Sequence, residues 1–166
     1  MPARLKTLVR VAVIGIVVVL VAIQFVPYGR DHDNPPVTGE PNWDSDATRQ
    51  LAVDACFSCH SNETEWPWYS NVAPMSWMIQ RDIDQGRDAL NFSEFDPEQD
   101  EAEDAADTVA DGEMPPLRYE LAHAEARLSD SERRRLIEGL ARTFGDDDNS
   151  GPGGGGDDDN SGPGGG

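Results

Sequence analysis

The sequence predicts an all-α protein. Apolar residues recur at helical spacing through much of the stretch 43–145, for example at Leu136, Leu140 and Phe144. Helix-capping signals begin several of these stretches, and none shows the alternation of apolar and polar residues that a half-buried strand requires. About a hundred residues are enough for one small core. We therefore expect one helical domain over residues 43–145, with a different kind of segment at each end.

Residues 1–27 are predicted to form a transmembrane anchor. The stretch from Leu8 to Val26 is almost entirely apolar and is close to the roughly 20 residues that span a bilayer. Basic residues precede it, which predicts a cytoplasmic N-terminus and an extracytoplasmic remainder. A cleaved signal peptide is the alternative, although the usual small residues of a cleavage site are missing from VAIQFVPYG. We expect a single-pass protein of the cell membrane.

Two further segments lack the apolar residues of a folded domain. Residues 28–42 are rich in proline and are expected to form an extended tether between the membrane and the domain. Residues 146–166 contain the sequence DDDNSGPGGG twice and no apolar residue. A segment of that composition has nothing to bury, so we expect a disordered, acidic, Gly-rich tail.

The first two helices of the domain are expected on either side of an aromatic loop. Asp44 or Ser45 can cap a helix that runs to about Cys56. After the loop TEWPWYSNVAP, a second helix is expected from about Pro74 to Leu90. Its apolar stripe contains Met75, Met78, Ile79, Ile83 and Leu90.

Two more helices are expected in the second half of the domain. Asp96 followed by Pro97 predicts the start of an acidic helix that ends near Ala110. The sequence DGEMPPLRY is predicted to be a loop, because glycine and proline interrupt helices. Ser129 and Glu132 then form a capping-box pattern, which predicts a last helix closed by Gly145.

The only two cysteines lie in one short motif, Cys56-Phe57-Ser58-Cys59-His60. A structural zinc site would need a fourth ligand, a thioredoxin-like pair would need a βαβ context, and a disulfide would close a very small loop. Covalent attachment of haem needs two thiols at this spacing and a histidine that reaches the iron. The motif and the extracytoplasmic placement favour one covalent haem c, with His60 as the proximal iron ligand.

The second axial position of the iron has two main candidates. Met114 lies in a polar loop directly before two prolines, which restrict its backbone, and we predict it as the distal ligand. His123 is the alternative, because imidazole also binds iron well. Met75 and Met78 share a helical stripe with isoleucines, which favours core packing for both. The aromatic residues of the same region either wall the cofactor or fill the core; they are Trp66, Trp68, Tyr69 and Trp77.

The charge of the chain limits its partners. The formal net charge is −19, and such a surface repels nucleic acid. We expect no nucleic-acid partner. Cationic redox proteins suit this surface better.

Two stretches carry a resemblance to a known family. They are CFSCHSNETEWPWYSNVAPMSWMIQRDIDQGRDALNFSEFD and GEMPPLRYELAHAEARLSDSE. Together they resemble the haem-binding-domain family of bacterial c-type cytochrome-like proteins over roughly Leu51 to Leu140. The resemblance implies a small cytochrome c-like helical domain around a covalent haem, held by Cys56 and Cys59 with His60 on the iron. By analogy with cytochromes c, it implies Met114 as the distal ligand.

These features lead to one expected function and two alternatives. We expect a membrane-anchored mono-haem cytochrome that passes single electrons outside the cytoplasm and is not an enzyme. The first alternative is a haem-based sensor or small-ligand binder with a labile sixth ligand. The second is a haem enzyme such as a peroxidase, which the lack of a clear distal acid–base pair disfavours. Low-spin iron in both oxidation states would distinguish the electron carrier from the sensor.

Overall fold

A computed structural model of the protein describes residues 2–96 and 99–145 and confirms the all-α prediction. Within these residues there are helices but no strand, and a single isolated bridge joins Gly39 to Glu94. The α-helices are α1 (Ala3–Ile23), α2 (Asp46–Ala55), α3 (Phe57–His60), α4 (Met75–Ala89), α5 (Ala105–Ala110), α6 (Leu117–Ala122) and α7 (Asp130–Phe144). Two 3₁₀ turns are η1 (Trp68–Asn71) and η2 (Asp100–Ala102). The predicted tail, 146–166, lies outside the described residues.

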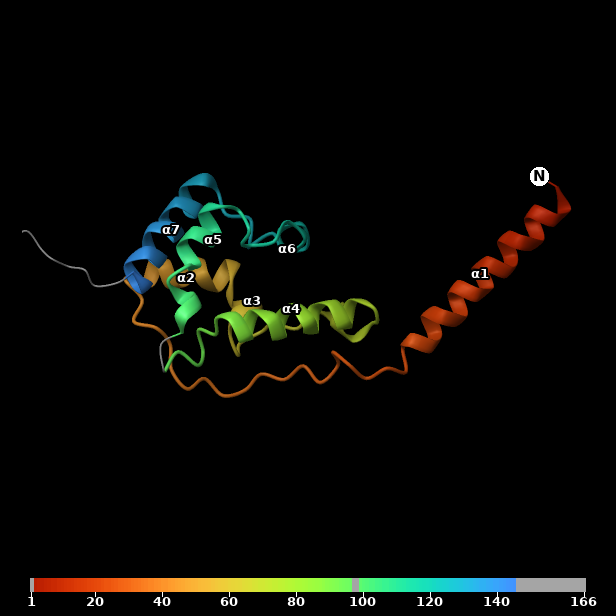
Figure 1. The fold of residues 1–166 in the computed structure, drawn as a ribbon, viewed down its shortest axis with the longest axis horizontal. Coiled ribbons are helices and arrows are strands. Elements are labelled where there is room, and N and C mark those ends of the chain that lie inside the picture. The colour runs from red at the N-terminus through yellow and green to blue at the C-terminus, as the bar shows by residue number, and fades with distance from the viewer. Residues whose placement is uncertain (1, 97–98, 146–166) are drawn as a thin grey trace, which may run out of the picture.

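Helix α1 projects away from the remaining helices, which form one compact group (Figure 1). From Arg4 to Ile23 it is long and apolar enough to cross a membrane, and this stretch is not buried against the rest of the chain. The helix begins before the apolar stretch, because Arg4, Leu5 and Lys6 are good helix formers. It ends at Ile23, shortly before Pro27.

The core of the domain lies where α2, α5 and α7 meet the segment after α4. Leu136 and Leu140 of α7 are fully or almost fully buried, and so is Ala52 of α2. Aromatic rings fill the space beside them: Trp43 contacts Phe57, Phe92 and Phe144, and Phe95 also contacts Phe144. Large apolar rings supply much of the burial that a domain of this size needs.

The helices with strong capping signals lie where the sequence predicted them. The Ser45 side chain accepts a hydrogen bond from the Thr48 N–H at 3.2 Å and begins α2. The capping box of Ser129 and Glu132 is complete and begins α7. Each side-chain cap satisfies backbone donors that a helix start leaves without a partner, so these boundaries follow from local chemistry alone.

The predicted acidic helix is shorter and interrupted. The 3₁₀ turn η2 and the short helix α5 occupy its place, and Pro97 lies outside the described residues. Asp100 and Asp104 carry like charges four positions apart, which destabilises a helix. The predicted apolar face still packs inward: Ala102, Ala106 and Val109 are buried.

Helix α6 occupies the end of a stretch that was predicted to be a loop. The two prolines bar a helix before them, but Pro116 has an extended backbone and is itself the N-cap of α6. Its fixed φ is compatible with a helix that starts immediately afterwards. The prediction was therefore wrong for Leu117 to Tyr119. The short elements α3 and η1 also lack a signal in the sequence.

The segment predicted as a tether is bonded to the domain along its length. Tyr28 donates to Asp84 of α4 at 3.1 Å, and the ring of His32 stacks on Trp66 at 4.5 Å. Further along, Glu40 forms an ion pair with Arg49 of α2 at 2.7 Å. These contacts fix the position of the chain between α1 and α2.

Candidate cofactor site

The Cys56-x-x-Cys59-His60 motif forms the junction of two helices. Cys56 ends α2 and is the N-cap of α3, and its carbonyl accepts hydrogen bonds from the N–H groups of Cys59 and His60 at 3.1 and 3.0 Å. Residues three and four positions apart in one helical turn share a face. The local fold therefore gathers the three side chains that the sequence singled out. Both cysteines are free thiols.

Burial keeps both thiols protonated. Burial raises the pKa of Cys56 to about 12 and that of Cys59 to about 11, because an apolar surrounding disfavours the charged thiolate. The other thiol adds to the effect at Cys56, and the carboxylate of Asp82 adds to it at Cys59. At neutral pH the pair consists of two neutral S–H groups.

The imidazole of His60 is fixed by the end of α4. Its Nδ1 lies 2.9 Å from the carbonyl oxygen of Leu90, and a carbonyl can only accept, so Nδ1 carries the hydrogen. Burial lowers the pKa of His60, partly offset by hydrogen bonds to the backbone of Leu90 and Gly86. A neutral ring with its hydrogen on Nδ1 has its lone pair on Nε2, which is the form that binds a metal.

Gly86 allows α3 and α4 to pack closely. A Cβ atom at this position would lie 2.5 Å from the carbonyl oxygen of Cys59, a distance at which the helices would have to separate. Just beyond the end of α4 the backbone N–H of Phe92 donates to the carbonyl of His60 at 2.8 Å. The motif is therefore held to the C-terminal end of α4 by two contacts: the close packing of Gly86 on Cys59 and the hydrogen bond from Phe92 to His60.

A small cavity lies directly beside Cys59, with a volume of about 60 Å³. It is lined by residues of α3, α4, α6 and the loop around η1: Ser58, Cys59, Thr64, Glu65, Pro67, Tyr69, Ile79, Asp82, Ile83, Tyr119 and His123. Pockets for larger ligands usually have about 300 to 1,000 Å³. The cavity as it stands is thus too small for a porphyrin.

Tyr119 of α6 covers this cavity. Its hydroxyl donates to Ser58 Oγ at 2.7 Å, and burial raises the pKa of Tyr119 to about 12. Sequence reasoning missed both residues. Ser58 could have been noticed as a polar residue inside the motif, but Tyr119 lies 61 positions away and entered the sequence analysis only within a predicted loop and a stretch that carries the family resemblance.

His123, the alternative distal ligand, lies in the cavity with Cys59. Its ring stacks on Tyr119 with 4.0 Å between the ring centroids, and its Nε2 lies 3.4 Å from the hydroxyl of Tyr69. Tyr119 and Tyr69 thus both contact the His123 ring inside the cavity. The structure thus brings this histidine to the cavity beside Cys59.

Met114, the predicted distal ligand, packs against the hydrophobic core, as Cys56 does. It is half-buried, and its backbone bonds to Thr108 and Arg133 hold the loop between α5 and α6. Met114 thus lies at the hydrophobic core, whereas His123 lies in the cavity beside Cys59. Both assignments remain predictions.

Two other interpretations of this region are wrong. Met75 and Met78 were assigned to the core, but their exposed fractions are 41% and 48%. Trp68 is 80% exposed, so it neither fills the core nor lines the cavity. The helical stripe of α4 misled the prediction because Ser76, Ile83 and Gly86 form its buried face instead.

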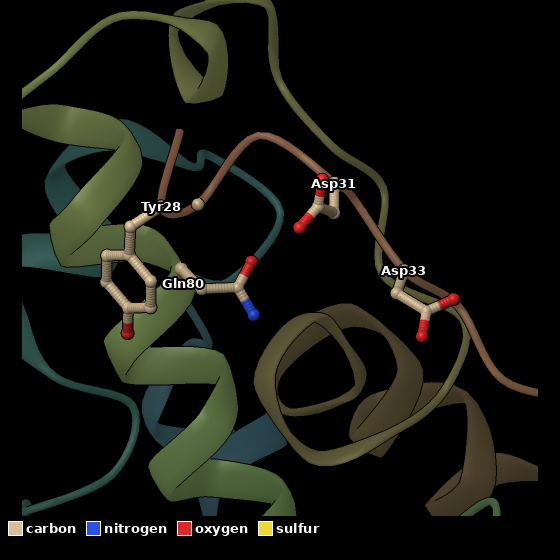
Figure 2. A pocket seen from close by; sticks show the side chains of 5 residues that line it. Tyr28, Asp31, Asp33 and Gln80 are labelled. Atoms are coloured by element: carbon tan, nitrogen blue, oxygen red, sulfur yellow. The ribbon is translucent and has the colours of Figure 1, made fainter. Parts of the chain in front are cut away.

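A larger hollow, about 330 Å³, lies at a distance from this chemistry. Tyr28, Asp31 and Asp33 of the segment after α1 form it together with Gln80 of α4 (Figure 2). Neither a thiol nor an imidazole lines it, so it does not suit a haem. Among the described residues no group of three or more His, Cys, Asp and Glu side chains could hold a metal ion, and a zinc site is not assembled there.

One comparison with known proteins identifies a family. The sequence model of a family described as "Haem-binding domain" matches residues 18–142. No curated protein and no solved structure matches the chain.

Proposed function

Because the chain belongs to the haem-binding domain family, we propose that it holds one haem covalently through Cys56 and Cys59 and transfers single electrons. The observation that carries this proposal is the bond between His60 Nδ1 and the Leu90 carbonyl directly behind two free thiols. It prepares Nε2 as an iron ligand in the neutral state that ligation requires. The donor set therefore fits a c-type haem.

Cys56 and Cys59 would hold the haem through thioether bonds. Each thiol would add its S–H across one vinyl group, with a C–S bond formed, the hydrogen on the other vinyl carbon and no oxidant needed. The bound haem supplies a one-electron iron couple, and the protein sets its potential through axial ligands, burial and hydrogen bonds. Residues beside the motif then exclude water and orient the ligands.

Room for the porphyrin requires that α6 moves. None of the residues of α6 is buried, so displacing it exposes little apolar surface. The side-chain bonds that hold it to α3, α4 and α7 are the hydrogen bond from Tyr119 to Ser58, an exposed ion pair from Arg118 to Asp82 at 2.9 Å and a half-buried ion pair from Arg133 to Glu120 at 3.2 Å. Exposed ion pairs contribute about 0 to 1 kcal/mol. We assign α6 the role of a cover that shifts when haem enters.

The proposal places Met114 on the second axial position. It is supported by a thioether that packs beside the same core as Cys56, in a loop that Arg133 holds through the Met114 carbonyl at 3.4 Å. His60 and Met114 would hold the iron with the same two ligands in both oxidation states, which suits electron transfer. If the protein is instead a sensor, the hydrogen-bonding groups of Tyr69 and His123 would face an exchangeable small ligand in the cavity.

The proposal also includes α1 as a membrane anchor and cationic proteins as redox partners. Helix α1 has the length and composition of a single span, and the basic residues at its N-terminal end favour a haem domain on the extracytoplasmic side. With a net charge of −19, the chain attracts cationic redox partners by long-range electrostatics.

The test is haem attachment in a host that matures c-type cytochromes. The wild-type chain should give a haem-stained band after denaturing electrophoresis, and Cys56→Ala/Cys59→Ala should lose it. Ser58→Ala, within the same motif, is the matched control and should keep the band. Haem that acid–organic extraction removes completely from the wild-type protein would contradict covalent attachment. High-spin ferrous iron that binds carbon monoxide readily would favour the sensor.

A further inference from the structure

The surface beside the end of α1 is unusually apolar for this chain. From Trp66 to Gln80 the sequence contains no charged residue, although 27% of the whole chain is charged. Within this stretch Trp68, Val72 and Met75 are exposed, and we call these three residues the loop patch. An exposed aromatic and apolar group of this kind commonly marks an interaction site.

The loop patch is tied to the end of α1 by a pair of hydrogen bonds. Gln24 Nε2 donates to the carbonyl of Ala73 at 2.8 Å, and the Ala73 N–H donates to Gln24 Oε1 at 3.1 Å. Ala73 lies between Val72 and Met75, so both bonds join the patch to the first residue after α1. In Figure 1 the N-terminal end of α4 is correspondingly the part of the domain next to the end of α1.

The end of α1 continues the same apolar surface. Phe25 is 83% exposed and Val26 is also exposed. Tyr28 then bonds to Asp84 of α4, which holds the chain against the domain immediately after the span. If α1 crosses a bilayer, these residues leave it at the boundary between acyl chains and headgroups.

We propose that the loop patch inserts into the lipid–water interface and forms a second membrane contact of the domain. This inference rests on the membrane anchorage proposed above. Tryptophan is enriched at that boundary, because its apolar ring and polar N–H suit the two sides of it. The lack of charged residues between Trp66 and Gln80 also favours membrane contact at this surface, whereas the acidic remainder of the domain is repelled by anionic lipid. The partner is therefore the headgroup region of a zwitterionic bilayer around α1.

The cofactor does not account for the exposure of the loop patch. The cavity beside Cys59 is lined by Pro67, Tyr69 and Ile79, which are neighbours of the patch in sequence, but by none of its three residues. Trp68 instead makes an edge contact with the ring of Tyr69, at 5.8 Å between centroids. Tyr69 thus separates the exposed tryptophan from the cavity.

The test uses the full-length haem protein in nanodiscs of phosphatidylcholine that carries a photoactivatable group on its acyl chains. Cleavage after Glu65 releases the loop patch from the haem-bearing peptide, and mass spectrometry then maps the labelled residues. We expect label in α1 and also in residues 66–78. Trp68→Ser/Val72→Ser should lose the label at 66–78 and keep it in α1, with an unchanged haem spectrum.

Leu117→Ser/Leu121→Ser is the matched control. Both leucines lie on α6 and are 70% exposed, and the double change should leave the label at 66–78 in place. Label in α1 with none at 66–78 of the wild-type protein would overturn the loop patch as a membrane contact. A lack of label in α1 would instead contradict the anchorage. A shifted haem spectrum in Trp68→Ser/Val72→Ser would assign the patch to the cofactor and overturn the proposal.

Discussion

At the scale of single residues, the position of one carbonyl group decides what His60 can do. The Leu90 oxygen fixes the hydrogen on Nδ1, so the ring has one defined acceptor nitrogen. Leu90 is at the C-cap of α4, where a helix leaves carbonyl groups without partners inside it. The end of α4 and the imidazole of His60 thus satisfy each other's hydrogen-bonding needs.

The residue with the sharpest prediction is Met114. Met114→Leu keeps the volume of the side chain but removes the thioether, so packing should change little. We expect the ferric protein to lose its near-infrared sulfur-to-iron charge-transfer band, the ferrous iron to bind carbon monoxide, and the reduction potential to fall. Absorption spectra and a redox titration measure these changes. The covalent haem should remain, because Cys56 and Cys59 are untouched.

His123→Ala is the control for that experiment. It removes the ring that stacks on Tyr119 but should leave the charge-transfer band in place. If Met114→Leu remains low-spin and His123→Ala does not, the iron is ligated by two histidines, and the cavity residue is the true distal ligand.

The residues of the candidate site were predictable to different degrees. Cys56, Cys59 and His60 follow from a contiguous motif, because one helical turn brings them together without help from the rest of the fold. Leu90 and Tyr119 do not, because they arrive from 30 and 61 positions away through tertiary packing. A single sequence carries no signal for contacts of that range.

At the scale of elements, local chemistry was a good guide wherever a side chain acts on its own backbone. The caps at Ser45 and Ser129 placed α2 and α7 correctly. The short helices α3 and α6 contain four and six residues and are too short to be stable alone. They form because neighbouring elements hold them, which periodicity cannot reveal.

The contact of α2 with α7 depends on a glycine. A Cβ at Gly139 would overlap the Thr48 side chain, so the two helices pack at a distance that only glycine permits. Gly139→Ala should improve helix propensity by up to about 1 kcal/mol but cost about 1–3 kcal/mol through overpacking. We expect a net loss in the free energy of unfolding, measured by circular dichroism during urea unfolding.

The matched control is Glu138→Ala on the exposed face of the same helix. It improves propensity slightly without touching α2, so the free energy of unfolding should stay within about 0.5 kcal/mol of the wild-type value. A more stable Gly139→Ala protein would show that α2 and α7 can separate freely.

At the scale of the whole molecule, the chain between α1 and α2 joins α1 and the domain into one unit. Its composition predicted a tether, and the contacts of Tyr28, His32 and Glu40 with the domain could not be read from proline content. Each of these side chains finds its partner on a distant element. The span and the domain are therefore oriented relative to each other by bonded residues.

The last prediction concerns the span itself. If α1 is an uncleaved anchor, the mature protein begins at Met1 or Pro2 and stays in the membrane fraction during alkaline carbonate extraction. Val13→Arg places a charge at the middle of α1, where it costs about 2.5–3.5 kcal/mol, so a larger share should become extractable. Leu5→Arg, at the end of the helix, can reach the headgroups and should stay in the membrane. A mature N-terminus near Tyr28 would contradict the anchor and make α1 a signal peptide, while haem attachment outside the cytoplasm would be retained.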